Sequence, residues 1–318
     1  MPASAGTAET AAPVDAPQSD ADQSHAELGP ETPGRLVIQR VLFHGPTPLV
    51  PADLYAQVTR GSARRDRLRV AVAPGSHVTT NTYFGRIHAT YWQRWTDVTE
   101  MEVSLLVSGS GSIRLHASDT NKIDRVVDAQ AVRGVDGAVV VLRAAADRFV
   151  DGGGLWLEFA TDDSALEVSD VRWTVDSARP TRSASMVICT YNRVDDCLNT
   201  LEALANDTEP LECLRRVHVV DQGSDPLESR ERFAEIAGRF GDKLDYIRQP
   251  NLGGAGGFTR GIYEVVGEQA TDADVLLMDD DVQLEPEIVI RLTAFANRTT
   301  TPTIVGGQML NLLHPTHL

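Results

Sequence analysis

The alternation of apolar and polar side chains divides the chain into two parts with different periods. Between Leu36 and about Val175, apolar residues recur at every second position in short runs, such as Leu155-Trp156-Leu157-Glu158-Phe159. This period places apolar side chains on one face of a strand, which indicates half-buried antiparallel strands. Similar runs occupy 68–72, 102–107 and 112–116, with glycine-rich turn signals at 109–111 and 151–154. The pattern predicts a β-sandwich or jelly roll over residues 36–176.

A polar stretch from Asp176 to about Ser185 predicts a linker, and beyond it the period changes. A continuous apolar run at 185–190 is typical of a buried parallel strand, and apolar spacing over 194–205 predicts a helix. Further strands are expected at 216–221, 244–247, 275–278 and 303–305, with helices at 230–240 and 285–297. Alternating strands and helices predict an α/β domain over residues 185–318, with a doubly wound, mostly parallel sheet.

Composition and charge narrow the function classes. The chain has 318 residues, which corresponds to roughly two domains. Its 29 basic and 45 acidic residues give a formal net charge of −16. This balance argues against a nucleic-acid partner, because phosphate neutralisation needs clustered Lys and Arg. No apolar run approaches the roughly 20 residues of a membrane-spanning helix. Cys189, Cys197 and Cys213 lack metal-ligand spacing and are expected to be reduced, core-filling thiols of a cytosolic protein.

The first 35 residues have a composition of their own. They are rich in Ala, Pro, Asp, Glu and Ser and contain no Lys or Arg before Arg35. A secretory signal needs a basic start and an apolar middle, and this segment has neither. We expect a disordered acidic tail over 1–35, because too little apolar surface is present to offset the entropy of ordering.

An aromatic cluster, Tyr91-Trp92-Gln93-Arg94-Trp95, interrupts the predicted strands. Exposed rings at this place would stack on a sugar ring, whereas buried rings would anchor the core or a domain interface. The second role is the expectation, because isolated aromatic residues usually fill cores.

Polar turns follow the predicted parallel strands, at the carboxyl ends where such sheets bind ligands. After the first strand, Tyr191 is suited to stack on a base, Thr190 to hydrogen-bond to it, and Arg193 to meet a phosphate or the base edge. After the second strand, Asp221-Gln222-Gly223-Ser224 suits polar contacts with a base or ribose. Each turn is weak evidence alone, since Asp and Gly are ordinary turn residues.

A glycine-rich segment at 251–258 follows the third strand, with four glycines in the five positions 253–257. Such a segment lets backbone N–H groups approach an anion, and the next helix adds its positive N-terminus. No Gly-Lys-Ser/Thr follows, so the segment is not a Walker loop, and its place after the third strand does not suit a dinucleotide fingerprint. A merely flexible loop is the alternative.

Three adjacent carboxylates, Asp279-Asp280-Asp281, end the apolar run at 275–278. They repel one another, and placing them at a core edge is costly unless a cation compensates. Asp279 and Asp281 are suited to share one hard divalent ion, Mg²⁺ or Mn²⁺. That ion would bridge to a diphosphate and so let an acidic site hold an anionic ligand. A solvated acidic turn is the alternative.

A diphosphate and a metal without a Walker lysine suggest a nucleotide-sugar glycosyltransferase. Asn251-Leu252-Gly253-Gly254 followed by the acidic triplet resembles the inverting, GT-A-fold glycosyltransferases. Together with motifs at 83–84, 91–95, 190–193, 221–223 and 305–311, these residues are similar to the polymerising galactofuranosyltransferases of actinobacterial arabinogalactan (cell-wall galactan) synthesis. The resemblance runs from about residue 36 to the last residue, and one departure is Cys189, where the family has proline.

The resemblance implies transfer from UDP-galactofuranose to a polyprenyl-diphosphate-linked galactan acceptor, with alternating β-1,5 and β-1,6 linkages. It implies a homotetramer that associates peripherally with the cytoplasmic face of the membrane. The implied roles are uridine contacts from Thr190, Tyr191, Arg193 and Gln222; diphosphate or sugar contacts from Asn251, Gly253 and Gly254; Mn²⁺ (or Mg²⁺) ligation by Asp279 and Asp281; and a ribose or donor-sugar contact from Asp280.

No residue of the chain matches the family's catalytic base or its third metal ligand. We therefore expect both beyond Leu318, a glycosyltransferase domain that is incomplete at its C-terminus, and no turnover by this chain alone. Two alternatives stay open: another metal-dependent nucleotide-sugar transferase, such as a rhamnosyl- or galactopyranosyltransferase, and a non-catalytic glycan-binding or assembly module. The acidic triplet separates the last from the others, because a module without a donor has no need of it.

Overall fold

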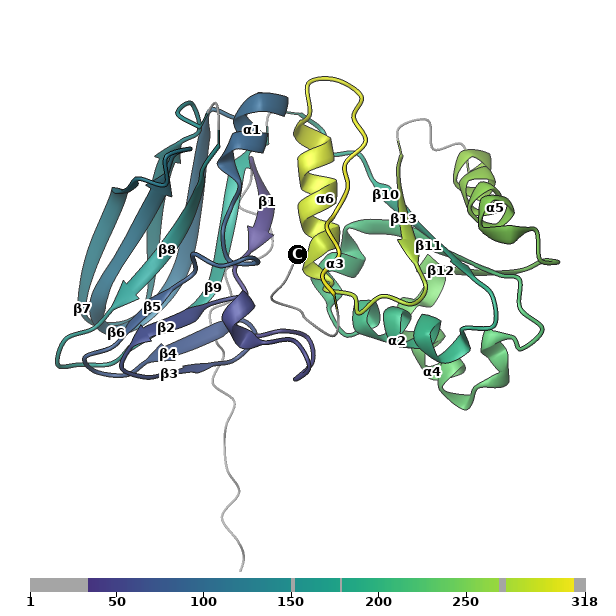
Figure 1. Ribbon diagram of the computed structural model, residues 1–318, viewed down its shortest axis with the longest axis horizontal. Helices are drawn as coiled ribbons and strands as arrows, with labels where there is room; N and C mark the ends of the chain where they lie inside the picture. The colour runs from purple at the N-terminus through teal and green to yellow at the C-terminus, as the bar shows by residue number, and fades with distance from the viewer. Residues whose placement is uncertain (1–33, 150–151, 178, 269–272, 312–318) are drawn as a thin grey trace, which may run out of the picture.

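The computed structural model describes residues 34–149, 152–177, 179–268 and 273–311. Figure 1 shows a β-sandwich beside a parallel sheet with its helices, and helix α6 (Glu287–Arg298) stands between them. The acidic tail expected over 1–35 lies almost wholly outside the described residues. The fold class expected from the two hydrophobic periods is confirmed.

The sandwich is antiparallel throughout its described strands. Its strands follow the order β2-β5-β8-β6-β9-β4-β3, with β1 paired to β9 and β7 paired to β6. The elements are β1 (Arg35–Arg40), η1 (Ala52–Leu54), β2 (Gln57–Arg60), β3 (Ala63–Arg65), β4 (Arg69–Val72), β5 (His77–Thr79), α1 (Ala89–Trp95), β6 (Glu100–Ser118), β7 (Asp124–Ala145), β8 (Gly154–Ala160) and β9 (Leu166–Asp176).

Strand β6 corrects the expectation of two strands joined by a turn at 109–111. It is one strand, which pairs with β9 over residues 102–109 and with β8 over residues 112–118, so it passes from one layer into the other. The register shifts at Gly109, whose φ of +105° favours glycine, and a Cβ there would overlap the carbonyl oxygen of Ala165. The predicted turn is therefore a bulge that bends the strand.

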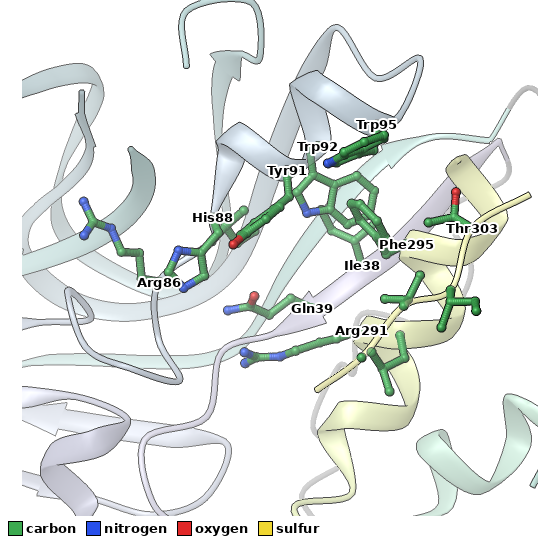
Figure 2. A pocket seen from close by; sticks show the side chains of 15 residues that line it. Ile38, Gln39, Arg86, His88, Tyr91, Trp92, Trp95, Arg291, Phe295 and Thr303 are labelled. Atoms are coloured by element: carbon green, nitrogen blue, oxygen red, sulfur yellow. The ribbon is translucent and has the colours of Figure 1, made fainter. Parts of the chain in front are cut away.

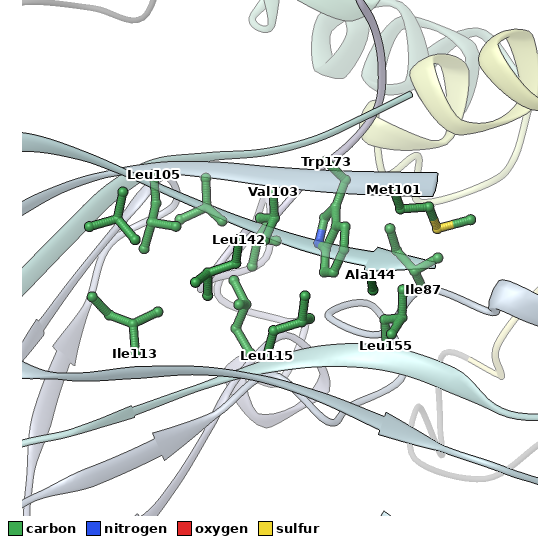
Figure 3. Packing of buried hydrophobic residues seen from close by; sticks show 14 of the residues in the cluster. Ile87, Met101, Val103, Leu105, Ile113, Leu115, Leu142, Ala144, Leu155 and Trp173 are labelled. Carbon is green, nitrogen blue, oxygen red and sulfur yellow. The ribbon is translucent and has the colours of Figure 1, made fainter. Parts of the chain in front are cut away.

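The sandwich core lies between these layers, as Figure 3 shows. Val103 and Leu105 point into it from the first half of β6, Ile113 and Leu115 point into it from the second half, and Trp173 joins them from β9. All five are fully buried. The period-two pattern thus arises because alternate residues of each strand face this core.

The second body is a four-stranded parallel sheet in the order β12-β11-β10-β13. Helices α2 and α4 pack on one face through Leu198, Leu201 and Ile236. Helix α5 covers the other face, where a Cβ on Gly261 would overlap Val187. Its elements are β10 (Ala184–Thr190), α2 (Val194–Ala205), α3 (Thr208–Glu212), β11 (Leu214–Asp221), η2 (Leu227–Ser229), α4 (Glu231–Phe240), η3 (Gly241–Lys243), β12 (Leu244–Arg248), α5 (Gly253–Gly267), β13 (Asp274–Asp279) and α6.

One expectation about this sheet is wrong. The strand expected at 275–278 is present as β13, an edge strand of the described sheet whose Val275 and Leu277 are 38% and 53% exposed. The fifth strand expected at 303–305 is absent from the described residues, and Ile304 is fully exposed. The reason lies after α6, where Thr300 donates its backbone N–H to the carbonyl of Trp95 (3.1 Å). This contact carries the chain along the sandwich instead of beside β13.

Candidate functional site

The carboxyl ends of the parallel strands frame a groove of about 510 Å³. Tyr191 follows β10, Gln222 follows β11, and Asn251 follows β12, and all three line the groove together with Arg248. The Tyr191 ring is half exposed. The structure thus brings together three of the predicted donor-binding residues, because parallel strands place their carboxyl ends at the same edge of the sheet.

The side chain of Gln222 holds the loop between β12 and α5. Its Oε1 accepts from the backbone N–H of Leu252 (2.8 Å) and from Gln249 Nε2 (3.1 Å), and its Nε2 donates to the carbonyl of Gly253 (3.0 Å) and to Cys189 Sγ (3.2 Å). The amide is almost fully buried. The uridine contact that the resemblance implies for Gln222 stays a prediction, and this geometry adds a positioning role in the loop that borders the groove.

The turn after β10 depends on Asn192, a residue that sequence reasoning missed. Its φ of +55° lies in the left-handed region, which Asn tolerates better than most residues. Asn192 Oδ1 accepts from the backbone N–H groups of Ser224 (2.8 Å) and Asp225 (3.2 Å), which ties the first turn to the second. Thr190 is buried, and its hydroxyl has no hydrogen-bond partner within the described chain.

Asp221 joins the next two strands, and its role was also missed. Its buried carboxylate accepts from the backbone N–H of Leu227 (3.0 Å), from the Tyr246 hydroxyl (2.7 Å) and from Arg248 Nη1 (2.8 Å). Burial and the Asp221 carboxylate raise the pKa of Tyr246, so the phenol remains the donor. In the sequence, an Asp at a strand end is an ordinary turn residue. Its role becomes visible only when the fold places β12 beside β11. The result is an Arg248 guanidinium fixed at the groove.

The glycine-rich segment is the first turn of α5 rather than a loop before it, since the helix begins at Gly253. Asn251 Oδ1 accepts the N–H of Gly253 (2.9 Å) and so supports this helix start. A Cβ at Gly253 or Gly254 would meet no atom within 4 Å, whereas a Cβ at Gly257 would overlap Cys189 Sγ. Gly253 and Gly254 therefore leave open space at the positive helix end, and Gly257 permits close packing on the sheet.

The acidic triplet lies beside the carboxyl end of β10, because Cys189 of β10 pairs with Asp279 of β13. Thr200 Oγ1 of α2 donates to the carbonyl oxygens of Asp280 (3.2 Å) and Val282 (3.1 Å), which fixes the backbone after β13. Arg193 Nη1 lies 3.4 Å from Asp281 Oδ2. Partial burial, assisted by the charge of Asp281, raises the pKa of Asp280.

Two of these carboxylates are suited to hold a divalent ion together with the phosphates of a ligand. No group of three His, Cys, Asp or Glu in the described ranges has the spacing of a complete metal site. Asp279 and Asp281 are exposed, however, and two carboxylates completed by substrate phosphates are a common way of holding a small, hard cation. The donor set therefore fits Mg²⁺ or Mn²⁺.

An interdomain clasp holds the segment after the triplet. We use this term for Arg40, Tyr55 and Arg67 of the sandwich with Asp207, Glu285 and Glu287 of the α/β body. Arg40 Nε donates to Glu287 Oε2 (2.7 Å) and its Nη2 to Asp207 Oδ2 (2.7 Å), while Tyr55 and Arg67 each donate to Glu285 (2.6 Å). Burial opposes the charge of Arg40, but these carboxylates outweigh it, and the pKa of Arg40 is raised.

Two family models match the chain, one for each body. Residues 38–176 match the galactofuranosyltransferase 2 N-terminal family, and residues 180–318 match the glycosyltransferase-like family 2. Galactofuranosyltransferase GlfT2 of Mycolicibacterium smegmatis is 34% identical over 291 residues, which cover 89% of this chain and 45% of the relative. By sequence, the chain is GlfT2-like. GlfT2 of Mycobacterium tuberculosis is 33% identical over the same coverage, so the GlfT2-like chain spans about half the length of the curated relatives it matches.

Two solved structures match parts of the chain at low sequence identity. An arabinose-bound α-L-arabinofuranosidase matches with a TM-score of 0.28 and 12% identity, covering 45% of this chain and 26% of that one. A family 22 carbohydrate-binding module matches with a TM-score of 0.25 and 12% identity, covering 40% and 83%. These scores are too low to support an argument about function. In the described part of the chain, we find no helix with the length and apolarity needed to span a membrane.

Proposed function

We propose that this chain is the donor-binding part of a metal-dependent, inverting galactofuranosyltransferase that uses UDP-galactofuranose. The observation that carries the proposal is the groove that gathers Tyr191, Arg248 and Asn251 beside the N-terminus of α5 and the acidic triplet. A nucleoside diphosphate needs a stacking surface, an anion site and a compensated charge, and these residues supply all three. The galactofuranosyl specificity is supported by the GlfT2-like sequence of both bodies.

Each residue has a defined part in the proposal. Tyr191 stacks on the uracil base, and Gln222 keeps the loop after β12 in place. Thr190 and Arg193, which flank Tyr191 in the same turn, are the further residues proposed to contact uridine. The open helix start at Gly253 and Gly254 receives the diphosphate.

On the opposite side of the diphosphate, Asp279 and Asp281 hold the divalent ion. Asp280, between these two residues, faces the ribose or the donor sugar. A bound Mn²⁺ would neutralise the diphosphate and stabilise it as a leaving group.

We assign no catalytic base. Three candidate carboxylates contact arginines: Asp195 with Arg232 (3.3 Å), Asp196 with Arg193 (3.5 Å) and Glu285 with Arg67 (2.6 Å). A base needs an available lone pair within reach of the acceptor hydroxyl. Asp195 and Asp196 lie in the first turn of α2 and Glu285 belongs to the interdomain clasp, so each has a structural role instead.

The acceptor and the cellular setting are part of the same proposal. We infer a polyprenyl-diphosphate-linked galactan as the acceptor, peripheral association with the cytoplasmic face of the membrane, and a homo-oligomer, by resemblance a tetramer. Their support is the similarity to GlfT2 across both bodies. This support comes from the sequence and not from contacts in the structure.

Competition between donors tests the proposal. Mn²⁺-dependent binding of UDP is measured by calorimetry, and UDP-galactofuranose, UDP-galactopyranose and a dTDP-hexose are each titrated as competitors. The proposal predicts that UDP-galactofuranose competes best. A preference for UDP-galactopyranose or for the thymidine nucleotide would favour another nucleotide-sugar transferase, and no nucleotide binding at all would favour a glycan-binding module.

A further inference from the structure

A second hollow, of about 600 Å³, lies between α1 of the sandwich and α6 of the α/β body (Figure 2). Its volume falls within the usual range for small-ligand sites. None of the residues that line it lines the groove beside Tyr191. We call it the junction cavity, and nothing in the proposed donor site accounts for it.

Aromatic rings of α1 form one wall of the junction cavity. Trp92 is buried and meets Phe295 of α6 edge to face, with ring centroids 5.0 Å apart, so it is the interface anchor expected from the sequence. Its neighbours differ, because Tyr91 is 60% and Trp95 44% exposed. Rings that are exposed on a fixed helix offer flat apolar faces at a small entropic cost to a ligand. The aromatic cluster therefore contains one buried interface anchor and two exposed rings.

Arg86, His88 and Arg291 add polar groups to a lining that is otherwise largely apolar. The Nε atoms of Arg86 and Arg291 are buried and lack hydrogen-bond partners in the described structure; Arg291 Nε lies 3.8 Å from Glu287, beyond hydrogen-bond distance. Arg86 already donates to Ser118 and lies over the Trp156 ring, whereas the Arg291 side chain is 21% exposed and is open to donate to an oxygen-rich ligand. Desolvation and the two arginine charges lower the pKa of His88, which leaves its ring neutral near pH 7. No carboxylate lines the described cavity, so it does not suit a cation.

We propose that the junction cavity binds an uncharged oligosaccharide, with its rings stacked on Tyr91 and Trp95 and its hydroxyl oxygens accepting from Arg291. A sugar chain combines apolar ring faces with many hydroxyl acceptors, which matches this lining better than an alkyl chain does. A glycan held here would tether a growing polymer to the same protein that binds the donor. The choice of galactofuranose as the sugar rests on the proposed function, whereas the site itself does not.

Titration of an octyl di-galactofuranoside, followed by calorimetry and tryptophan fluorescence, tests the proposal. Tyr91→Ala and Trp95→Ala should each weaken binding by about three- to ten-fold, the amount expected for loss of one aromatic contact. Trp95→Phe should retain most of the affinity, because a flat ring remains. Tyr263→Ala is the matched control, since Tyr263 is a 70% exposed tyrosine on α5 that does not line the cavity.

The titration with UDP and Mn²⁺ on the same preparations separates the two proposals. Unchanged UDP binding together with weakened glycan binding in the α1 variants would support the junction site. The junction proposal is overturned by no glycan binding, by equal weakening in Tyr263→Ala, or by equal binding of an octyl chain on oligoethylene glycol. Glycan binding without any UDP binding would count against the proposed function and leave the junction site standing.

Discussion

Replacing Arg40 by Met tests whether the interdomain clasp stabilises the α/β body through the segment that follows the acidic triplet. The Arg40 and Glu287 side chains are 3% and 0% exposed, so the substitution leaves a carboxylate buried without its closest cation. Removing one partner of a buried pair costs roughly 3–5 kcal/mol. With a urea m-value of about 2 kcal/mol per molar, the unfolding midpoint should fall by about 1.5–2.5 M.

Two optical probes report on the two bodies separately. All four tryptophans, Trp92, Trp95, Trp156 and Trp173, lie in the sandwich, whereas every described α-helix except α1 lies in the α/β body. Tryptophan fluorescence therefore follows one body, and far-ultraviolet circular dichroism at 222 nm follows mainly the other. The two transitions should coincide in the parent chain and separate in Arg40→Met, with the helical transition occurring at lower urea.

Two controls and the pH dependence make this test sharper. Arg143→Met removes a pair to Glu102 in which Arg143 is 57% exposed, and such pairs contribute at most about 1 kcal/mol. Adding Glu287→Leu to Arg40→Met should recover much of the loss, because no charge then stays buried.

Burial already raises the pKa of Glu287, and losing Arg40 raises it further. When the pKa of a carboxyl is higher in the folded than in the unfolded protein, the protein becomes less stable as pH rises from the unfolded pKa through the folded pKa. The free energy of unfolding of Arg40→Met should therefore be lower at pH 8 than at pH 5. Coincident transitions and a midpoint shift no larger than that of Arg143→Met would refute the reasoning.

Further predictions concern the glycines and thiols of the donor site. Gly254→Val should weaken UDP binding at least several-fold without a change in the thermal midpoint, since open space receives the side chain in the free protein; unchanged affinity in a folded variant would mean that this helix start does not meet the diphosphate. Gly257→Ala should destabilise the folded protein by about 1–3 kcal/mol through overlap with Cys189, whereas Gly254→Ala should not. Adding Cys189→Gly to Gly257→Ala should restore part of the lost stability. Equal unfolding midpoints for the two single variants would contradict this packing. Burial raises the pKa of the Cys197 thiol, so in a thiol-reagent titration at pH 8 Cys197 should react only on unfolding, and fast reaction in the folded chain would show that its burial is wrong.

The parts of the fold that follow from local pattern could be predicted from the sequence. The helix at 194–205 matches α2, because its apolar spacing alone determines which face is buried. For the site, the sequence predicted only that the residues after the parallel strands meet at one edge of the sheet. The role of Gln222 was not predictable, because its four partners come from two distant parts of the chain, Cys189 and residues 249–253.

Long-range pairing explains the remaining differences. The edge position of β13 depends on where the chain goes after α6, which local periodicity does not encode. The clasp joins Arg40 to residues 167 and 247 positions away, Asp207 and Glu287. Single charges at such separations carry no sequence signal, so the interdomain contact emerges only when both bodies are folded.

Calorimetric titration of UDP, first with Mn²⁺ and then with excess chelator, tests the central claim most directly. The carboxylates repel a diphosphate unless a cation lies between them, so binding should require Mn²⁺. Asp279→Asn with Asp281→Asn should abolish the metal dependence, and each lost charge-assisted contact should cost about 1.5–3 kcal/mol, or roughly ten- to a hundred-fold in affinity. Asp162→Asn with Asp163→Asn, a pair of exposed carboxylates on the sandwich, is the matched control and should bind as the parent does. Equal affinity for UDP with Mn²⁺ and with chelator would contradict the proposed donor site.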